Sequence, residues 1–100
     1  MTIDREHVLA KLREQREHIE QEYGLRMVGL VGSVARGEAT EKSDIDVIVD
    51  VTGRPTLFSL TGAEEDLAAA VGLNLPVQIV LRETMRPRAR RLIERDLIPF

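Results

Sequence analysis

The sequence predicts an α/β domain in which helices pack against a small mixed β-sheet. Three short segments are rich in branched apolar residues, as strands are, and they lie at residues 25–31, 45–51 and 76–81. The segments around them place apolar residues at three- and four-residue steps, which is typical of amphipathic helices. The predicted order is helix, strand, helical turn, strand, helix, strand, helix, within a single domain of residues 1–100.

The first predicted element is a helix over residues 4–22. Its apolar stripe consists of Val8, Leu12, Ile19 and Tyr23, with Leu9 at the margin. The negative charge of Asp4 suits the first turn of a helix, and Gly24 is a natural residue to end it. Residues 25–31 are apolar at nearly every position, so we expect a strand that is buried on both faces.

The second predicted strand, residues 45–51, carries charge on one of its faces. Gly32 ends the first strand, and a helical turn over residues 33–36 and a polar loop over 38–42 lead to the second. Along this second strand, one face consists of Ile45, Val47 and Val49, and the other of Asp44, Asp46, Ile48 and Asp50. Carboxylates on a buried strand conflict with burial, and such conflicts are expected mainly at functional sites.

The second half of the chain predicts a helix, a strand and a helix. The first helix is expected from Pro55 to about residue 71, where Gly72 stops it, with an inner stripe of Leu57, Leu60, Leu67 and Val71. A capping box over residues 61–64 is the alternative, and it would start the helix later or break it near Gly62. A strand follows over residues 76–81. The last helix begins at Thr84 or Pro87 and ends at Arg95, with inward-facing Met85, Ala89, Leu92 and Ile93.

Composition narrows the classes of function. The net charge is −3, the pI is near 5.4 and only three residues are aromatic, which disfavours direct binding to nucleic acid. The chain has no cysteine, so thiolate metal sites and a cysteine nucleophile are excluded. No apolar run approaches eighteen residues, so no membrane association and a cytoplasmic location are expected.

Asp44 and Asp46 are the first candidate site. Side chains two residues apart on a strand point to the same face, with Cα atoms about 6–7 Å apart. Two carboxylates that close repel each other unless a cation lies between them, so a divalent metal such as Mg²⁺ is the first hypothesis. A calcium loop is rejected, because the third acid and the glycine of such a loop are missing.

Gly32, Ser33 and Arg36 form the second half of the candidate site. Glycine lets a phosphate approach the backbone, serine offers a hydroxyl and an amide, and the guanidinium can share the charge. A P-loop is rejected, because Glu38 occupies the position of the required lysine. The simplest alternative is an ordinary glycine turn followed by an exposed strand.

The combined motif GSVARGEATEKSDIDVIV resembles the signature of the minimal nucleotidyltransferases. These proteins belong to the DNA polymerase beta-like nucleotidyltransferase superfamily, and the resemblance extends over nearly the whole chain. It implies that Gly32 and Ser33 hold the phosphates of ATP and that Asp44 and Asp46 are catalytic carboxylates and Mg²⁺ ligands. Arg36 contacts phosphate or anchors the loop. Ser43 lies at the nucleotide site too, where capping of a turn is favoured over a substrate contact.

The chain departs from the family pattern at one position. The family usually has a third carboxylate on the third strand, and Gln78 occupies that position here. Glutamine offers a carbonyl oxygen but carries no negative charge and takes up no proton in the useful range. Asp50 and Glu83 are considered as substitutes, and neither position is convincing. Nucleotide binding is therefore better supported than turnover.

The resemblance also implies a partner protein. Short members of the family are typically antitoxins paired with a HEPN-domain ribonuclease, and some attach AMP to a tyrosine of that toxin. Six arginines in residues 82–95 form either a solvated helix face or a surface for an anionic partner. Two hypotheses follow: an Mg²⁺-dependent AMP transferase that modifies the toxin, or an antitoxin with weakened catalysis that neutralises the toxin by binding it.

Overall fold

A computed structural model of the chain describes residues 3–100, so the first two residues of the predicted domain lie outside the described part. Four strands form one mixed sheet: β1 (Leu25–Val31), β2 (Ile45–Val51), β3 (Val77–Leu81) and β4 (Ile98–Pro99). Their order across the sheet is β3-β2-β1-β4. β1 is antiparallel to both of its neighbours, whereas β2 and β3 are parallel. The predicted fold class, a small mixed sheet with helices packed on it, is confirmed.

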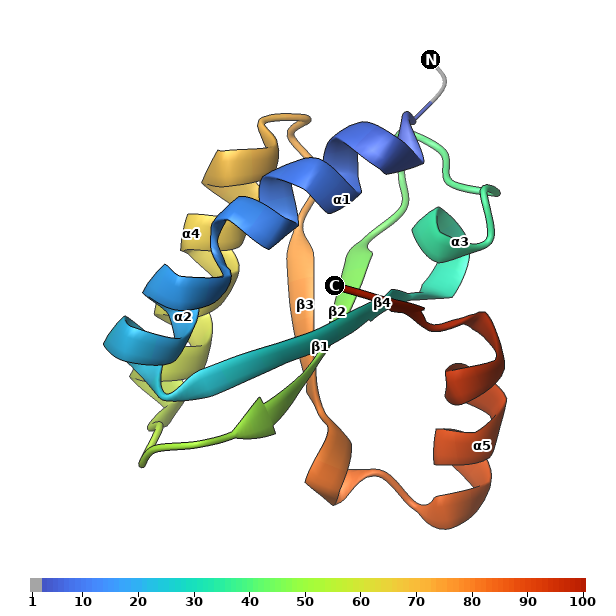
Figure 1. Cartoon of the computed structure of the whole chain (residues 1–100). Helices are drawn as coiled ribbons and strands as arrows, with labels where there is room; N and C mark the ends of the chain where they lie inside the picture. Colours follow the sequence, from blue (N-terminus) through green and yellow to red (C-terminus); the bar gives the residue numbers. More distant parts are fainter. Residues whose placement is uncertain (1–2) are drawn as a thin grey trace.

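Five α-helices surround the sheet: α1 (Arg5–Glu14), α2 (Arg16–Tyr23), α3 (Gly32–Ala35), α4 (Leu57–Val71) and α5 (Pro87–Asp96). Figure 1 shows α1, α2 and α4 on one side of the sheet and α5 on the other, near the single turn of α3. A short 3-10 helix, η1 (Arg82–Thr84), connects β3 to the segment that leads to α5. Within the described residues, no helix is both long and apolar enough to cross a membrane.

The core lies between the sheet and the three helices α1, α2 and α4. The predicted alternation along β2 is confirmed, because Ile45, Val47 and Val49 join the core with side chains of these helices. Ile48 is buried on the opposite face, where Gly29 of β1 lies beside it. A side chain at Gly29 would overlap Leu97, so the glycine lets the end of the chain pack on β1. This packing forms β4. The strand has only two residues and one of them is proline, so the sequence pattern does not predict it.

The helix predicted over residues 4–22 is two helices that meet at Gln15. The amide of Gln15 donates to the carbonyl of Leu12, a three-residue step that tightens the helix locally. The break separates α1, which packs on α4, from α2, which packs on both β1 and α4. Residues 5–23 contain no proline or glycine that would break a helix, so we attribute the break at Gln15 to tertiary packing.

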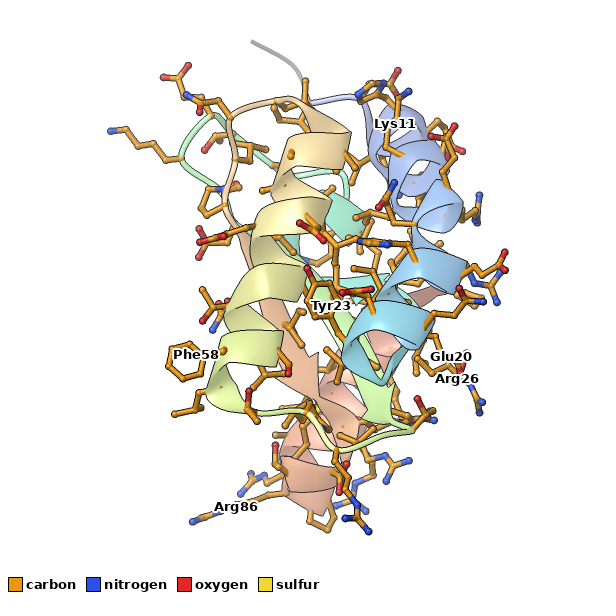
Figure 2. The ribbon with its side chains drawn as sticks, turned by 90° about the vertical axis from the view of Figure 1, so that its left-hand side faces the viewer. Lys11, Glu20, Tyr23, Arg26, Phe58 and Arg86 are labelled. Carbon is orange, nitrogen blue, oxygen red and sulfur yellow. The ribbon has the colours of Figure 1, made fainter. Side chains whose placement is uncertain are left out.

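The start of α4 corrects two predictions. The capping box is formed by Thr56 and Ser59, whose side chains bond reciprocally to each other's backbone amides, so neither Pro55 nor residues 61–64 begin the helix. Leu57 was expected inward, but 81 % of its surface is exposed, and Phe58 beside it also points away from the body (Figure 2). A start at residue 57 places Leu57 in the first turn, beyond the edge of the core.

The inward stripe predicted for the last helix is also wrong. α5 begins at Pro87, one of the two expected starts, but none of its residues is buried. Ala89 and Leu92 are exposed, and Met85 and Ile93 are only half-buried. The helix lies away from the main core (Figure 1). Its apolar residues Leu92 and Ile93 line a cavity instead.

A polar cluster joins α2 to α4 on the outer surface. Tyr23 lies between the two helices (Figure 2), and its hydroxyl donates to Asp66 over 2.6 Å. The Asp66 carboxylate also lies 2.8 Å from Nε2 of His18. These hydrogen bonds hold the pKa of Asp66 below its ordinary value, and the bond to Asp66 raises the pKa of Tyr23 to about 12. Gly62 provides the space that the Tyr23 ring occupies.

The outer edge of β3 is protected by Glu64. Its carboxylate accepts a hydrogen bond of 2.8 Å from the backbone amide of Ile79, on the side of β3 that has no strand neighbour. We expect Glu64→Ala to lower the free energy of unfolding by about 1–2 kcal/mol, because a charge-assisted bond to a half-buried amide is lost. Thermal unfolding followed by circular dichroism measures this effect. Glu65→Ala is the matched control, and an equal loss there would contradict the assignment.

Candidate functional site

The candidate site lies where three strands meet. Asp46, near the start of β2, has Val31 of β1 on one side and Gln78 of β3 on the other. Val31 ends β1 immediately before Gly32, so the Gly-Ser turn emerges beside Asp46. Residues that are 15 and 32 positions from Asp46 in the sequence are thus its direct neighbours in the sheet.

Gly32 lies against the Asp46 carboxylate. Its φ of +82° is in the left-handed region, which disfavours every residue except glycine. A β-carbon at this position would also overlap one carboxylate oxygen of Asp46. Both the backbone conformation and the lack of space therefore require glycine here, and they leave the backbone close to the acid.

Asp46 is held at an energetic cost. Burial raises the pKa of its carboxyl, and the nearby charge of Asp44 raises it further, whereas Arg36 partly offsets both effects. Asp44 precedes β2 and is exposed to solvent. The two carboxylates are thus close enough to repel each other, as their spacing in the sequence predicts.

Arg36 anchors the turn that follows α3. Its Nε donates to Glu38 over 3.0 Å, and its Nη1 donates to Asp96 of α5 over 3.4 Å. Arg5 supports the same turn from α1 by donating to the carbonyl of Ala35 over 2.7 Å. Of the two roles considered for Arg36, anchoring is observed. Its contact with phosphate stays a prediction.

Ser43 closes the loop before β2. Its hydroxyl accepts a hydrogen bond of 2.9 Å from the amide of Thr40, and its own amide donates to the Thr40 carbonyl. This is the turn-capping arrangement, and it fixes the approach of the chain to Asp44. A contact between Ser43 and nucleotide stays a prediction, as does that of Ser33, which is half-buried at the first turn of α3.

A cavity of about 420 Å³ opens beside Asp46, a size suited to a small ligand. Four of the positions singled out in the sequence line this cavity: Gly32, Arg36, Asp46 and Gln78. The other residues that line the cavity were not predicted as part of a site, and they are Val31, Val80, Leu92, Ile93 and Asp96. The amphipathic pattern of residues 87–96 predicts that Leu92 and Ile93 face inward, but it does not indicate whether they face the core or a cavity.

The position expected to hold a third carboxylate is neutral. Gln78 is exposed and lies in register beside Asp46. Asp50 is no substitute, because its carboxylate is engaged by the guanidinium of Arg82 through two hydrogen bonds. Glu83 lies in η1, beyond the end of β3. Among the described residues, no three His, Cys, Asp or Glu side chains cluster as a metal site.

The side chains at the site nevertheless fit a hard cation. Asp44 and Asp46 supply carboxylate oxygens, and Gln78 adds an amide oxygen on the adjacent strand. Mg²⁺ is commonly held by one or two carboxylates and completes its shell with water and substrate phosphates. The raised pKa of Asp46 marks an unbalanced negative charge that a cation would relieve.

This imbalance leads to a stability prediction. The pKa of Asp46 lies above its ordinary value of 3.8 in the folded protein, so the folded state binds the proton more tightly than the unfolded state. The contribution of Asp46 to stability should therefore fall as pH rises from 3.8 through the raised pKa. Asp46→Asn should remove this dependence and raise Tm of the metal-free protein at neutral pH by up to about 4 °C. Melting curves from pH 3 to pH 7 test this, and a lower Tm in the variant would contradict it.

The chain is similar to known proteins over most of its length. Residues 12–99 match the family described as the nucleotidyltransferase domain. The protein adenylyltransferase MntA of Thermococcus cleftensis is 30 % identical over 93 residues, which cover 93 % of this chain and 92 % of that protein. A protein of Methanocaldococcus jannaschii assigned as a protein adenylyltransferase is 34 % identical over 89 residues, covering 87 % of this chain and 88 % of that one.

Solved structures share the fold. A structure assigned as a minimal nucleotidyltransferase has a TM-score of 0.70 and 35 % identity, and the match covers 92 % of this chain and 95 % of that chain. A toxin–antitoxin structure with AMP-PNP has a TM-score of 0.65 over 97 % of this chain and 72 % of that chain. At 18 % identity, this second match shows likeness of fold alone. With its Gly-Ser turn, paired aspartates and matched length, the chain belongs to the nucleotidyltransferase domain family.

Proposed function

We propose that this protein is an antitoxin that transfers AMP from ATP to a tyrosine hydroxyl of a partner HEPN-domain ribonuclease toxin. The observation that supports this most directly is the placement of Asp46, which lies between the Gly32 backbone and Gln78 at the wall of a nucleotide-sized cavity. The relative named protein adenylyltransferase MntA, which matches over nearly its full length, supports the choice of reaction.

Each half of the site has its own role in the proposal. Gly32 and Ser33 bind the β- and γ-phosphates through backbone and hydroxyl donors, and Arg36 shares their charge by turning from Glu38. Asp44 and Asp46 hold Mg²⁺, which when bound neutralises phosphate charge and polarises the phosphorus under attack. Ser43 keeps the loop in the conformation that presents Asp44.

The proposed reaction is an in-line substitution at the α-phosphorus of ATP. The tyrosine oxygen forms a bond to that phosphorus, and the bond from phosphorus to the bridging oxygen breaks, so that pyrophosphate leaves. The hydroxyl proton passes to water, because the Gln78 amide accepts no proton in this pH range. The leucine and isoleucine of α5 keep one wall of the cavity apolar and limit the access of competing water.

The second candidate is an antitoxin with weakened or lost catalysis that neutralises the toxin by direct binding. Gln78 is the observation that favours it, since the position beside Asp46 offers neither charge nor a base. In this case nucleotide would bind without turnover.

Mass spectrometry of the toxin separates the two candidates. The protein is incubated with ATP, Mg²⁺ and the proposed HEPN-domain partner, and the mass of the partner is measured. Transfer predicts that the toxin gains the mass of one or more AMP groups on tyrosine and loses ribonuclease activity. No added mass, together with neutralisation that survives Asp44→Asn plus Asp46→Asn, would leave direct binding as the function.

A matched control guards against a general effect of charge. Glu22→Gln plus Glu65→Gln removes two carboxylates from α2 and α4, on exposed positions that make no hydrogen bond within the described residues. We expect this control to transfer AMP at the wild-type rate. If it lost activity as the aspartate variant does, the site assignment would be wrong.

A further inference from the structure

The charge of this chain is divided unevenly. Residues 82–96 contain six arginines and three carboxylates, so this segment carries +3 and the rest of the chain carries −6. Most of the segment is α5, which lies apart from the main core (Figure 1). An acidic protein thus presents one basic helix, and that helix forms a wall of the candidate site.

Two of the six arginines are neutralised within the protein. Arg82 binds Asp50 of β2, and Arg90 donates to Glu94 over 3.0 Å along α5. The two pairs also influence one another: Arg90 helps to lower the pKa of Asp50, and Glu94 helps to raise that of Arg82. The flank of α5 that carries Arg90 and Glu94 therefore faces charges of the sheet and has little left to offer a partner.

The other four arginines have no such partner. Within residues 3–100, no carboxylate lies within ion-pair distance of Arg86, Arg88, Arg91 or Arg95, and all four are exposed. Arg88, Arg91 and Arg95 follow each other at three- and four-residue steps, so they line one flank of the helix. Arg86 extends from the start of α5 away from the body of the protein (Figure 2). We call these four residues the arginine stripe.

The arginine stripe adjoins the cavity. Leu92 lies next to Arg88 and Arg95 on the helical surface, is 58 % exposed and also lines the cavity that contains Asp46. An exposed leucine flanked by unpaired arginines is suited to an amphipathic polypeptide with both acidic and apolar side chains. A chain bound along the stripe would pass the mouth of the cavity.

We propose that the arginine stripe is the docking surface for an acidic segment of the acceptor protein, and that docking there delivers the acceptor hydroxyl to Asp46. The inference rests on the proposed function and adds to it the recognition of the acceptor. Arginine binds carboxylates through paired hydrogen bonds, so glutamate and aspartate near the modified residue supply the affinity and the register.

A polypeptide fits this surface better than a nucleic acid does. Residues 82–96 contain no aromatic side chain on which a base could stack. The remaining charge of −6 repels a long phosphate backbone, whereas a short acidic segment needs to approach only the stripe.

A binding measurement without ATP tests the inference independently of transfer. The probe is a fluorescein-labelled peptide of glutamates around one central tyrosine, and its anisotropy is followed in low salt. We expect Arg91→Glu plus Arg95→Glu to weaken binding by about tenfold or more. Lys11→Glu plus Arg54→Glu changes the net charge equally at positions away from α5, and it should weaken binding by less than about threefold.

Two further variants and one competing ligand complete the test. Arg91→Gln plus Arg95→Gln, which removes charge without adding repulsion, should give an intermediate loss of affinity, and circular dichroism checks that each variant is folded. Asp44→Asn plus Asp46→Asn should bind the peptide at least as tightly as the wild type, so a failure of transfer is distinguishable from a failure of docking. Equal losses in the α5 and control variants, or tighter binding of an oligouridylate of equal charge, would overturn the inference.

Discussion

Replacing Gln78 with aspartate is expected to increase the rate of AMP transfer by about 10²- to 10⁴-fold, the usual contribution of a positioned general base. Position 78 lies in register beside Asp46 on the neighbouring parallel strand, so a carboxylate there would join Asp44 and Asp46 without any change of backbone. The added group could accept the proton of the attacking hydroxyl. It would also strengthen the hold on Mg²⁺.

The matched control is Gln78→Asn, which shortens the side chain equally but stays neutral, and it should leave the rate close to wild type. Single-turnover assays with the toxin and radiolabelled ATP measure the chemical step. A third carboxylate should also lower Tm of the metal-free protein, because it adds repulsion to the charge already held at Asp46. If Gln78→Asp slows transfer while binding of ATP is unchanged, the role given to this position is wrong.

The second large effect is expected from Asp44→Asn plus Asp46→Asn, which should reduce transfer by at least about 10³-fold. Both substitutions keep the size of the side chain, so Gly32 should keep its place beside residue 46. In the proposed mechanism, the loss follows from removing the carboxylates that would hold Mg²⁺ against the triphosphate. The affinity for Mg·ATP, measured by calorimetry, should fall with the rate.

The single variants should differ from each other. Asp46 lines the cavity and is partly buried, whereas Asp44 is exposed before the strand begins, so Asp46→Asn should cost more activity than Asp44→Asn. Full activity in Asp46→Asn would exclude the site as described. Wild-type binding of the acidic peptide in both variants would show that the effect is confined to the chemistry.

Much of the site was readable from the sequence because its elements are local. The alternation along β2 predicts which side chains face the core, and a two-residue spacing places Asp44 and Asp46 together. The glycine required after β1 has a physical cause that any homologous backbone would share: the chain must turn sharply beside an acid, with no space for a side chain. Recognition of Gln78 as the neighbour of Asp46 depended on resemblance, and the parallel register of β2 and β3 accounts for it.

The errors arose where burial depends on distant partners. Amphipathic spacing predicts that one face of α5 is sheltered, but the same spacing serves a core, a cavity wall or a docking surface. Leu57 fits the apolar period of α4, yet the helix begins only at Leu57, after its Thr56 cap, so this side chain lies in the first turn and is exposed. Periodicity describes direction around an axis and contains no information about where the axis ends.

By itself, the sequence determined the order of β1, β2 and β3 and of the helices between them, the face of β2 that meets the core, and the pairing of a Gly-Ser turn with two aspartates, but not the break between α1 and α2 or strand β4. These features depend on backbone geometry over a few residues, so they can be predicted without knowing the fold. Only the tertiary structure decided which side chains complete the site and which arginines remain free. Asp50 is occupied by Arg82, Arg36 is bound to Asp96, and the exposed flank of α5 borders the cavity because chain segments far apart in sequence pack together.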